Sequence, residues 1–431
     1  MDLSTAAELE LDPATTERIR TADRRLVEAA RGIKVLSILA WPVDVGQRFF
    51  ERWDRGAPEL PAPPRITADL GNKIAALDEL ARPVADHPLA LFVARTAESY
   101  AEAARLIGAT GTREFRERSI AIYGQPAERV APGGITNLEA AERLIEATEQ
   151  LAPQCKPADN EYCLTPEYVR QQMQRVFDLA FQAHPVRVVI DPRLASKAAA
   201  GAEQIRIRGQ TPYSESELRQ LIEHEGLVHT ATALNGRLQP FLTCLSLGAP
   251  RTTTTQEGIA TFAELVTGQI DLHRLRRIAL RVKAVQLGLD GANFLEMLQF
   301  FVDSGDSPRE AFHSVSRIFR GGSVGGGGIV FTKDSVYLRG LLLVHGFLRA
   351  AIEERRTELA HYLFSGRLTC RDVLELAPYF SRGMLRGPTY RPDWLSKLNQ
   401  LAAFLVMGTL TGEMGQRKLE LAEFHRPPAS W

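Results

Sequence analysis

The 431-residue chain lacks several features that would place it in a specialised class of protein. It has only four cysteines, Cys155, Cys163, Cys244 and Cys370, and no C-x-x-C pair. This number and spacing favour reduced thiols over a disulfide framework, with a Cys155–Cys163 bridge as the alternative. The formal net charge is zero, from 52 basic and 52 acidic residues. No general attraction to nucleic acid or to an anionic membrane is therefore expected.

The N-terminus also lacks the pattern of a secretory signal, because Glu8 and Glu10 stand where a signal would carry basic and apolar segments. The most apolar later run, Leu341–Val344, is too short to span a bilayer. We therefore expect a cytoplasmic protein with no membrane partner. Hydrophobic residues at 45% and charged residues at 24% are ordinary for a globular chain that buries a large core.

Helical patterns dominate the chain, which divides into two regions. Residues 1–150 carry helical apolar spacing and a proline-rich connector but no evident chemistry, so a helical scaffold or lid is expected. Residues 151–431 hold every candidate for chemistry. Two β-branched runs there, 186–190 and 205–208, predict strands that could pair as a hairpin, and a peptide could add to the second strand. The predicted fold is mostly α (α+β) with a small sheet.

The most informative motif is the run H-E-G-L-V-H at residues 224–229, near the middle of a predicted helix. Two imidazoles and a carboxylate are the components of a zinc peptidase: two nitrogen ligands and a glutamate that accepts a proton from the attacking water. Ser214 and Glu217 match a capping box at the start of this helix, and Asn235-Gly236 predicts its end.

The spacing of the two histidines is one residue too long for an ordinary helical zinc motif. Residues four apart in an α-helix differ by about 40° around the axis, whereas residues five apart differ by about 140°. A single π-type turn would return both to one face. Gly226 lowers the cost of that distortion, so a bulge or kink is predicted between Glu225 and His229. The alternative is two unrelated histidines, one in the core and one exposed.

A third ligand decides between these alternatives. Glu257 follows His229 by 28 residues and lies in the first turn of a helix that the threonine run 252–255 is expected to cap. A His/His/Glu set with an open fourth position is a known catalytic zinc site. Glu257 alone would be interpreted as a carboxylate that stabilises a helix N-terminus. His224, His229 and Glu257 are therefore a candidate ligand set for one Zn²⁺ per chain, with Glu225 as the candidate general base, and the helix-terminus interpretation of Glu257 stays open at this point.

Several ordered motifs make the chain resemble a bacterial family named for a Q-E-G-L-A motif. They are the run at 224–229, Asn235-Gly236, Gln239-Pro240, Gln256–Ala260, Arg320-Gly321-Gly322 and the block 331–340. That family shares its catalytic domain with the eukaryotic microtubule-associated tyrosine carboxypeptidases. The resemblance covers about residues 165–350. It implies a helical, zincin-like metallopeptidase with an H-E-x-x-x-H helix and, by position, the ligands His224, His229 and Glu257.

The chain departs from the family pattern in two places, and neither is a ligand. The motif interior is Gly-Leu-Val where the tubulin enzymes carry Gly-Thr before the second histidine, and Ile259 replaces the leucine of Q-E-G-L-A. The resemblance implies removal of one C-terminal residue, aromatic or acidic, from a peptide or protein tail. The first departure puts the identity of that substrate in question, so tubulin is not assumed.

A later block supplies candidate substrate contacts, because Lys333 and Tyr337 are four residues apart and would share one helix face. A carboxypeptidase needs a cation for the terminal carboxylate and a donor for the tetrahedral oxyanion. Tyr337 is the candidate donor, and the candidate cations are Lys333, Arg317, Arg320 and Arg339. The alternative is that these basic residues form a solvated face or pair with a neighbouring aspartate.

A glycine-rich stretch and a second glutamate lie near the candidate site in the sequence. Gly321–Gly328 holds six glycines but lacks the Gly-Lys-Ser/Thr of a phosphate loop, so a mobile flap is expected. Glu264, two turns after Glu257, is expected to support a ligand. An endopeptidase with the same zinc site, or a non-enzymatic regulatory or scaffold protein with a structural or vestigial site, remain the alternatives. Glu225 argues against the second, because a structural zinc site needs no general base.

Overall fold

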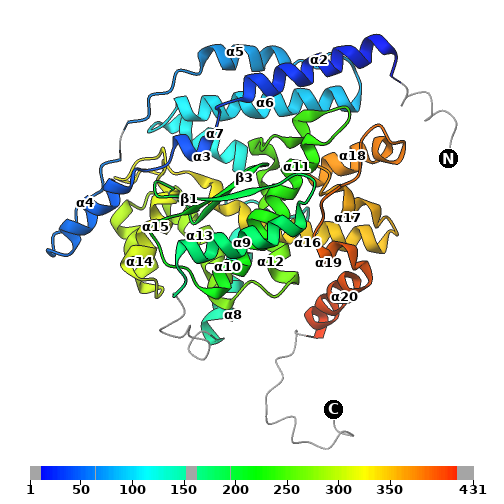
Figure 1. The fold of residues 1–431 in the computed structure, drawn as a ribbon. Coiled ribbons are helices and arrows are strands. Elements are labelled where there is room, and N and C mark those ends of the chain that lie inside the picture. Colours follow the sequence, from blue (N-terminus) through cyan, green and yellow to red (C-terminus); the bar gives the residue numbers. More distant parts are fainter. Residues whose placement is uncertain (1–10, 64, 152–162, 195, 415–431) are drawn as a thin grey trace, which may run out of the picture.

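The structure, a computed structural model, describes residues 11–63, 65–151, 163–194 and 196–414. Helices make up most of these residues, and they surround one three-stranded sheet (Figure 1). The prediction of a mostly α fold with a small sheet is therefore confirmed. Cys155 lies outside the described residues, whereas Cys163, Cys244 and Cys370 are free thiols.

The helices before residue 152 begin and end at clear sequence signals. Asp12 and Thr112, for example, each cap a helix by accepting a hydrogen bond from a main-chain amide of the first turn. Helices α2, α5 and α6 lie side by side along one side of the molecule, blue and cyan in Figure 1. The helices of this region are α2 (Pro13–Ala30), α3 (Val35–Ile38), α4 (Val43–Trp53), α5 (Gly71–Leu80), α6 (Pro88–Gly108), α7 (Arg113–Tyr123) and α8 (Asn137–Leu151).

The later helices alternate with short 3-10 segments. The capping box predicted from Ser214 and Glu217 is present, and Thr165 caps the helix before the sheet. The helical elements are α9 (Pro166–Ala180), α10 (Glu215–Leu221), η2 (Ile222–Thr230), α11 (Ala231–Arg237), η3 (Thr243–Ser246), η4 (Pro250–Thr252), α12 (Thr253–Val266), α13 (Leu272–Leu289), α14 (Phe294–Asp303), α15 (Pro308–Ile318), η5 (Thr332–Ser335), α16 (Val336–Glu353), α17 (Glu358–Tyr362), α18 (Cys370–Ser381), α19 (Asp393–Ser396) and α20 (Leu398–Met414).

The sheet consists of β1 (Arg187–Asp191), β2 (Ala198–Ala200) and β3 (Gln204–Arg208), in the order β1-β3-β2. The predicted hairpin of the first and last of these strands is wrong, because β1 and β3 pair in parallel. The alanine-rich segment between them forms a third strand that takes the antiparallel position beside β3. Since β3 is central, both of its edges are occupied, and a peptide cannot add to it as expected.

The helices α12 and α16 cross at a pair of glycines, which sets the position of the candidate site. A side chain at Gly258 would overlap the main chain of Gly340, and one at Gly340 would overlap the carbonyl of Thr254. Only glycine allows two helix backbones to approach this closely. The crossing brings Glu257, next to Gly258, beside the start of α16.

Two motif residues after the histidine helix hold distant parts of the chain against it. Asn235 and Gln239 use both ends of their side-chain amides to bond the main chain at residues 364–365 and 386–390. A side chain at Gly236 would overlap the main chain of Leu245. These motif positions therefore fix the C-terminal segments around the end of α11.

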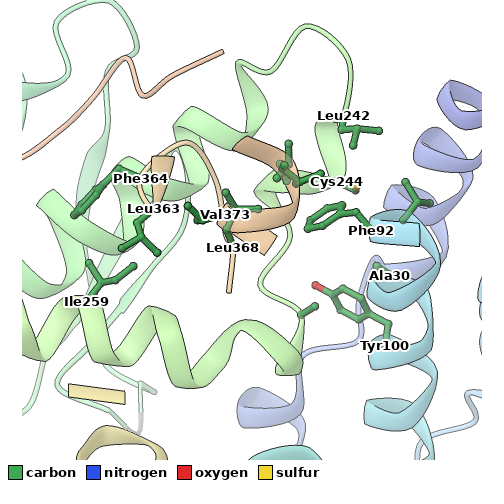
Figure 2. Packing of buried hydrophobic residues seen from close by; sticks show 14 of the residues in the cluster. Ala30, Phe92, Tyr100, Leu242, Cys244, Ile259, Leu363, Phe364, Leu368 and Val373 are labelled. Atoms are coloured by element: carbon green, nitrogen blue, oxygen red, sulfur yellow. The ribbon is translucent and has the colours of Figure 1, made fainter. Parts of the chain in front are cut away.

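The largest hydrophobic cluster joins the helices of residues 1–150 to the helices that carry the candidate site. Figure 2 shows Phe92 and Tyr100 of α6 facing Leu242, Cys244 and the segments after α17. Helix α2 also contacts η3 through buried polar bonds, because Asp23 accepts from the amides of residues 243 and 244. The predicted division of the chain at residue 150 stays a prediction, but the two parts share one core.

Among the described residues, one segment, Thr332–Glu353, is long and apolar enough to cross a bilayer by length and composition. The sequence prediction considered only the short run 341–344 and did not identify this segment, because its apolar positions extend along the whole of α16. Half of this segment is buried inside the protein, as in the core helix of a globular domain. It also carries Lys333, whose ammonium forms a buried ion pair with Glu257.

The glycine-rich loop 321–328 is fixed in place, contrary to the expectation of a mobile flap. Its main chain bonds to Gly291 and Phe294 at the turn between α13 and α14, and to Gly111 after α6. Gly326 has a positive φ and lies where a side chain would meet the carbonyl of Gly291. The glycines therefore serve close packing against neighbouring turns.

Candidate metal centre

The two histidines of the central motif lie on a π-helix, η2, between α10 and α11. The predicted bulge is confirmed, and it extends over more residues than the interval between Glu225 and His229. The wider turn brings the rings of His224 and His229 within 4.8 Å of each other, measured between centroids. Both side chains are buried. The extra residue of the motif is therefore absorbed by the π-turn rather than by a kink.

Gly226 is required for packing, which the sequence did not reveal. A Cβ atom at this position would overlap the ring of Phe177 on α9. Phe177 is itself fully buried and cannot move aside at low cost. Gly226 does not have a positive φ, so the backbone freedom expected from the sequence is not what this conformation uses. The glycine lets α9 pack directly beneath the histidine turn.

Glu257 of α12 completes a cluster of potential ligands with His224 and His229. Its Oε2 atom lies 3.4 Å from His224 Nε2 and 3.8 Å from His229 Nε2. Three tetrahedral zinc ligands bound at about 2.0–2.1 Å would lie roughly 3.4 Å apart. The same Oε2 atom is buried and has no hydrogen-bond partner among the described residues. The geometry and this unpaired oxygen fit a metal ion held by three protein atoms.

A second carboxylate supports His224 from behind. Glu264 Oε1 lies 2.6 Å from His224 Nδ1 and accepts a hydrogen bond from Arg274 Nη2, while Glu264 Oε2 accepts one from Arg274 Nε. Burial would raise the pKa of Glu264, but Arg274 and His224 hold it at about 2. The carboxylate therefore stays charged and orients the His224 ring with Nε2 toward Glu257. The position expected for Glu264 from the sequence is where the structure has it.

The environment of the two imidazoles differs. Burial disfavours the charged form of His224, but the nearby carboxylates of Glu257 and Glu264 raise its pKa to about 10. Burial lowers the pKa of His229, whose Nδ1 atom has no partner in the described part of the chain. A metal ligand must be the unprotonated imidazole, so a bound ion would compete with a proton for His224 Nε2.

Lys333 and Tyr337 meet at the other oxygen of Glu257. Lys333 Nζ lies 2.7 Å from Glu257 Oε1 and 2.6 Å from the Tyr337 hydroxyl, so the predicted shared face is confirmed. Burial alone would raise the pKa of Glu257, but Lys333 and the histidines hold it well below its usual range. Lys333 thus fixes one carboxylate oxygen while the other faces the histidines.

Three of the four predicted substrate-binding cations already pair with carboxylates of the protein. Lys333 pairs with Glu257, Arg317 forms two hydrogen bonds of 2.7 Å to Asp334, and Arg339 lies 2.8 Å from Glu128. The alternative of pairing with an aspartate thus holds for Arg317. Arg339 is directed to Glu128 before α8 rather than to the ligand cluster.

Arg320 is the exception among these cations. It forms no hydrogen bond or ion pair with the residues that the structure describes. Burial and the neighbouring Arg317 guanidinium lower its pKa to about 10. Asp334 and Tyr337 act on Arg320 in the opposite direction, so Arg320 lies within electrostatic range of Tyr337.

Glu225 precedes Gly226 on the π-turn and is partly exposed. Its carboxylate forms no hydrogen bond with any described residue, so both oxygens are available to a water molecule or substrate. It is close enough to His224 and His229 for its charge to act on both imidazoles. A free carboxylate beside a ligand cluster is the arrangement that a general base requires.

The sequence missed two contributors to the site. Arg367 Nη2 donates to the carbonyl of His229, 3.1 Å away. Thr232 bonds the same carbonyl and also Gln256 of the Q-E-G motif, which links η2 to α12. The motif around Gln256 could have indicated the second contact. No local pattern marks Arg367, because it lies 138 residues from its partner.

Comparison with known proteins gives one clear relationship. The sequence profile of the microtubule-associated tyrosine carboxypeptidases matches residues 47–411, most of the described chain. No curated protein sequence matches the chain. The narrower assignment to the Q-E-G-L-A family stays a prediction. The match covers every element of the ligand cluster, and we conclude that the chain belongs to the microtubule-associated tyrosine carboxypeptidase family, which implies a peptidase of the carboxypeptidase type.

Proposed function

We propose that this protein is a zinc-dependent metallocarboxypeptidase that removes one residue from the C-terminus of a peptide or protein tail. The observation that carries the proposal is the His224, His229 and Glu257 cluster with an unpaired Glu225 on the same π-turn. Two imidazole nitrogens and one carboxylate oxygen, with room for a fourth ligand, are the donor set of catalytic zinc sites. The family match supports the exopeptidase form of this chemistry.

When bound, zinc would supply a Lewis acid that acidifies water and polarises the scissile carbonyl. Glu225 accepts a proton as the water oxygen bonds to the carbonyl carbon. The carbon–nitrogen bond then breaks, and Glu225 returns the proton to the leaving amine. In this scheme the Glu225 carboxylate must reach both the water and the leaving amine. Its lack of protein partners leaves it free to do so.

Tyr337 is suited to donate a hydrogen bond to the developing oxyanion. Its oxygen accepts from Lys333 at 2.6 Å and from Arg317 at 3.2 Å. Because both neighbours are cationic donors, the phenolic proton has no role inside the protein and is free for the substrate. Tyr337 is also partly exposed. Removal of one such donor typically costs about 10²–10³-fold in turnover.

Two features of the proposal rest on the sequence alone. A cytoplasmic location with no nucleic-acid or membrane partner is proposed, and the charge balance supports it. The preferred terminal residue, aromatic or acidic, is predicted from the family resemblance.

An endopeptidase with the same zinc site is the second candidate function, and a protein with a vestigial site is the third. The unpaired Glu225 favours an active enzyme over the third.

The test compares the wild-type protein with Glu225→Gln, each loaded with zinc. We expect about one zinc per chain in both, because glutamine leaves the three ligands intact. Wild type should shorten N-acetylated peptides by single residues, and the variant should lose about 10²–10⁴-fold of that activity. Mass spectrometry of the products separates exopeptidase from endopeptidase cleavage. Equal activity of the two proteins, or wild type without bound metal, would contradict the proposal.

A further inference from the structure

The position of the terminal-carboxylate anchor follows from the chemistry of the leaving group. In the proposed function Glu225 returns a proton to the leaving amine, so that nitrogen must lie within hydrogen-bond reach of Glu225. In a carboxypeptidase the same residue carries the free α-carboxylate, only two bonds beyond the nitrogen. The cation that recognises this carboxylate must therefore lie on the Glu225 side of the ligand cluster.

Arg367 is the cation that fits this position. It follows α17, and its guanidinium is fixed to the histidine turn by the 3.1 Å hydrogen bond from Nη2 to His229 O. Burial lowers the pKa of Arg367, and the charges of Glu257 and Glu225 oppose that shift, so both carboxylates lie within electrostatic range. The Arg367 main chain is anchored as well, by a 2.7 Å hydrogen bond from its amide to Leu245 O.

The guanidinium of Arg367 has donors to spare. Its hydrogen bond to a main-chain carbonyl leaves it without a carboxylate partner among the residues the structure describes. Lys333, Arg317 and Arg339, by contrast, each pair with an acidic side chain. Arg367 is partly exposed, and exposed Gly248 lies against its Nη1 edge without a side chain to cover it. A guanidinium held in this way is ready to bind a carboxylate through two parallel hydrogen bonds.

Tyr100 is a second donor within electrostatic range of Arg367. Its side chain is 6% exposed, and its hydroxyl forms no hydrogen bond with the described residues. Figure 2 shows the ring projecting from α6 with the hydroxyl directed toward the helix that carries Ile259, α12. Burial raises the pKa of Tyr100 to about 12, while the charge of Arg367 acts in the opposite direction. The phenol therefore stays protonated at neutral pH and can donate to an anion.

We propose that Arg367 and Tyr100 form the subsite that binds the α-carboxylate of the substrate's C-terminal residue. The inference rests on the proposed carboxypeptidase function. It assigns recognition of the free C-terminal carboxylate to one residue from each predicted region of the chain, Tyr100 from residues 1–150 and Arg367 from residues 151–431. Arg320 is the rival candidate, since it too lacks a partner. Arg320 lies on the Tyr337 side, where it would contact the part of the substrate that precedes the scissile bond.

The experiment measures kcat/KM for N-acetylated tripeptides ending in tyrosine or glutamate, each as the free acid and as the amide. Wild type is expected to favour the acid by at least tenfold. Arg367→Met should reduce that ratio by about 10–100-fold with zinc content unchanged. Tyr100→Phe, which removes only a hydroxyl, should reduce it less. Arg367→Lys should keep part of it, and Arg320→Met should leave the ratio as in wild type.

Several outcomes would overturn the anchor while the carboxypeptidase function stands. They are equal cleavage of acid and amide by wild type, an unchanged ratio in Arg367→Met, or loss of the ratio only in Arg320→Met. An equal loss of activity on both peptides, together with loss of zinc, would assign Arg367 a structural role instead. Binding of the same acid and amide pairs to zinc-loaded Glu225→Gln tests the anchor even if wild type cleaves nothing. Absence of cleavage by wild type would count against the proposed function and not against the carboxylate subsite.

Discussion

Gly226 shows how a single residue determines the packing beneath the π-turn. Phe177 of α9 fills the space where a side chain at position 226 would begin. We expect Gly226→Ala to lower the free energy of unfolding by about 1–3 kcal/mol, since overpacking in a buried region costs that much. Chemical denaturation monitored by circular dichroism measures it. The intrinsic helix preference of alanine would act in the opposite direction, by about 1 kcal/mol.

A double-mutant cycle with Phe177→Leu provides the control for this prediction. If the clash with Phe177 is the cause, the smaller side chain should relieve part of the cost, and the two substitutions should be non-additive. Additive effects, or a stabilising Gly226→Ala, would show that the ring and the glycine are not coupled.

The candidate ligands illustrate which residue-level features a sequence can reveal. The five-residue interval between His224 and His229 is incompatible with one face of an α-helix, so the π-turn follows once both histidines are taken as ligands of one ion. The steric role of Gly226 and the contact from Arg367 depend on partners 49 and 138 residues away in the chain. No local periodicity encodes such distant partners. For this reason the sequence attributes Gly226 to backbone freedom rather than to packing, and it does not indicate Arg367 at all.

At the scale of elements, the crossing of α12 and α16 controls the distance between Glu257 and Lys333. A methyl group at Gly340 would overlap the carbonyl of Thr254 and force the two helices apart. We expect Gly340→Ala to weaken zinc binding and to lower kcat, because Lys333 would no longer hold Glu257 in place. Zinc titration against a competing chelator measures the first effect, and peptide hydrolysis measures the second.

Gly346→Ala is the matched control on the same helix. Nothing lies within 4 Å of a Cβ atom at Gly346, so this substitution should stabilise α16 slightly and leave the zinc site unaffected. If Gly340→Ala binds zinc as tightly as Gly346→Ala, the helix crossing does not set the ligand geometry.

The sheet marks the limit of element-level prediction. Strand positions were predicted correctly for β1 and β3, because β-branched residues and alternation mark them. Their pairing was wrong, because β2 consists of three alanines and has no such pattern. The intervening strand β2, which has no sequence signal, lets β1 and β3 pair in parallel rather than as an antiparallel hairpin, and the register depends on tertiary packing.

At the scale of the whole molecule, one buried carboxylate ties helix α2 to the region after the histidine helix. Asp23 of α2 accepts hydrogen bonds from Thr243 N at 3.0 Å, Thr243 Oγ1 at 2.7 Å and Cys244 N at 2.8 Å. It is 2% exposed, so water cannot replace it as a partner. The residues around this contact belong to the hydrophobic cluster that both regions share.

We expect Asp23→Ala to destabilise the protein as a whole rather than its first helix alone. Each buried donor left without a partner costs about 1–3 kcal/mol. Because the core is shared, α2 and the distant α18 should lose hydrogen-exchange protection together, in one cooperative transition. Asp12→Ala is the control: it removes only the exposed N-terminal cap of α2 and should cost about 1 kcal/mol, confined to that helix. Separate transitions for residues 1–150 and the remainder would instead make the predicted boundary one between two independently folding domains, and Tyr100 would then reach the Arg367 site only through their docking.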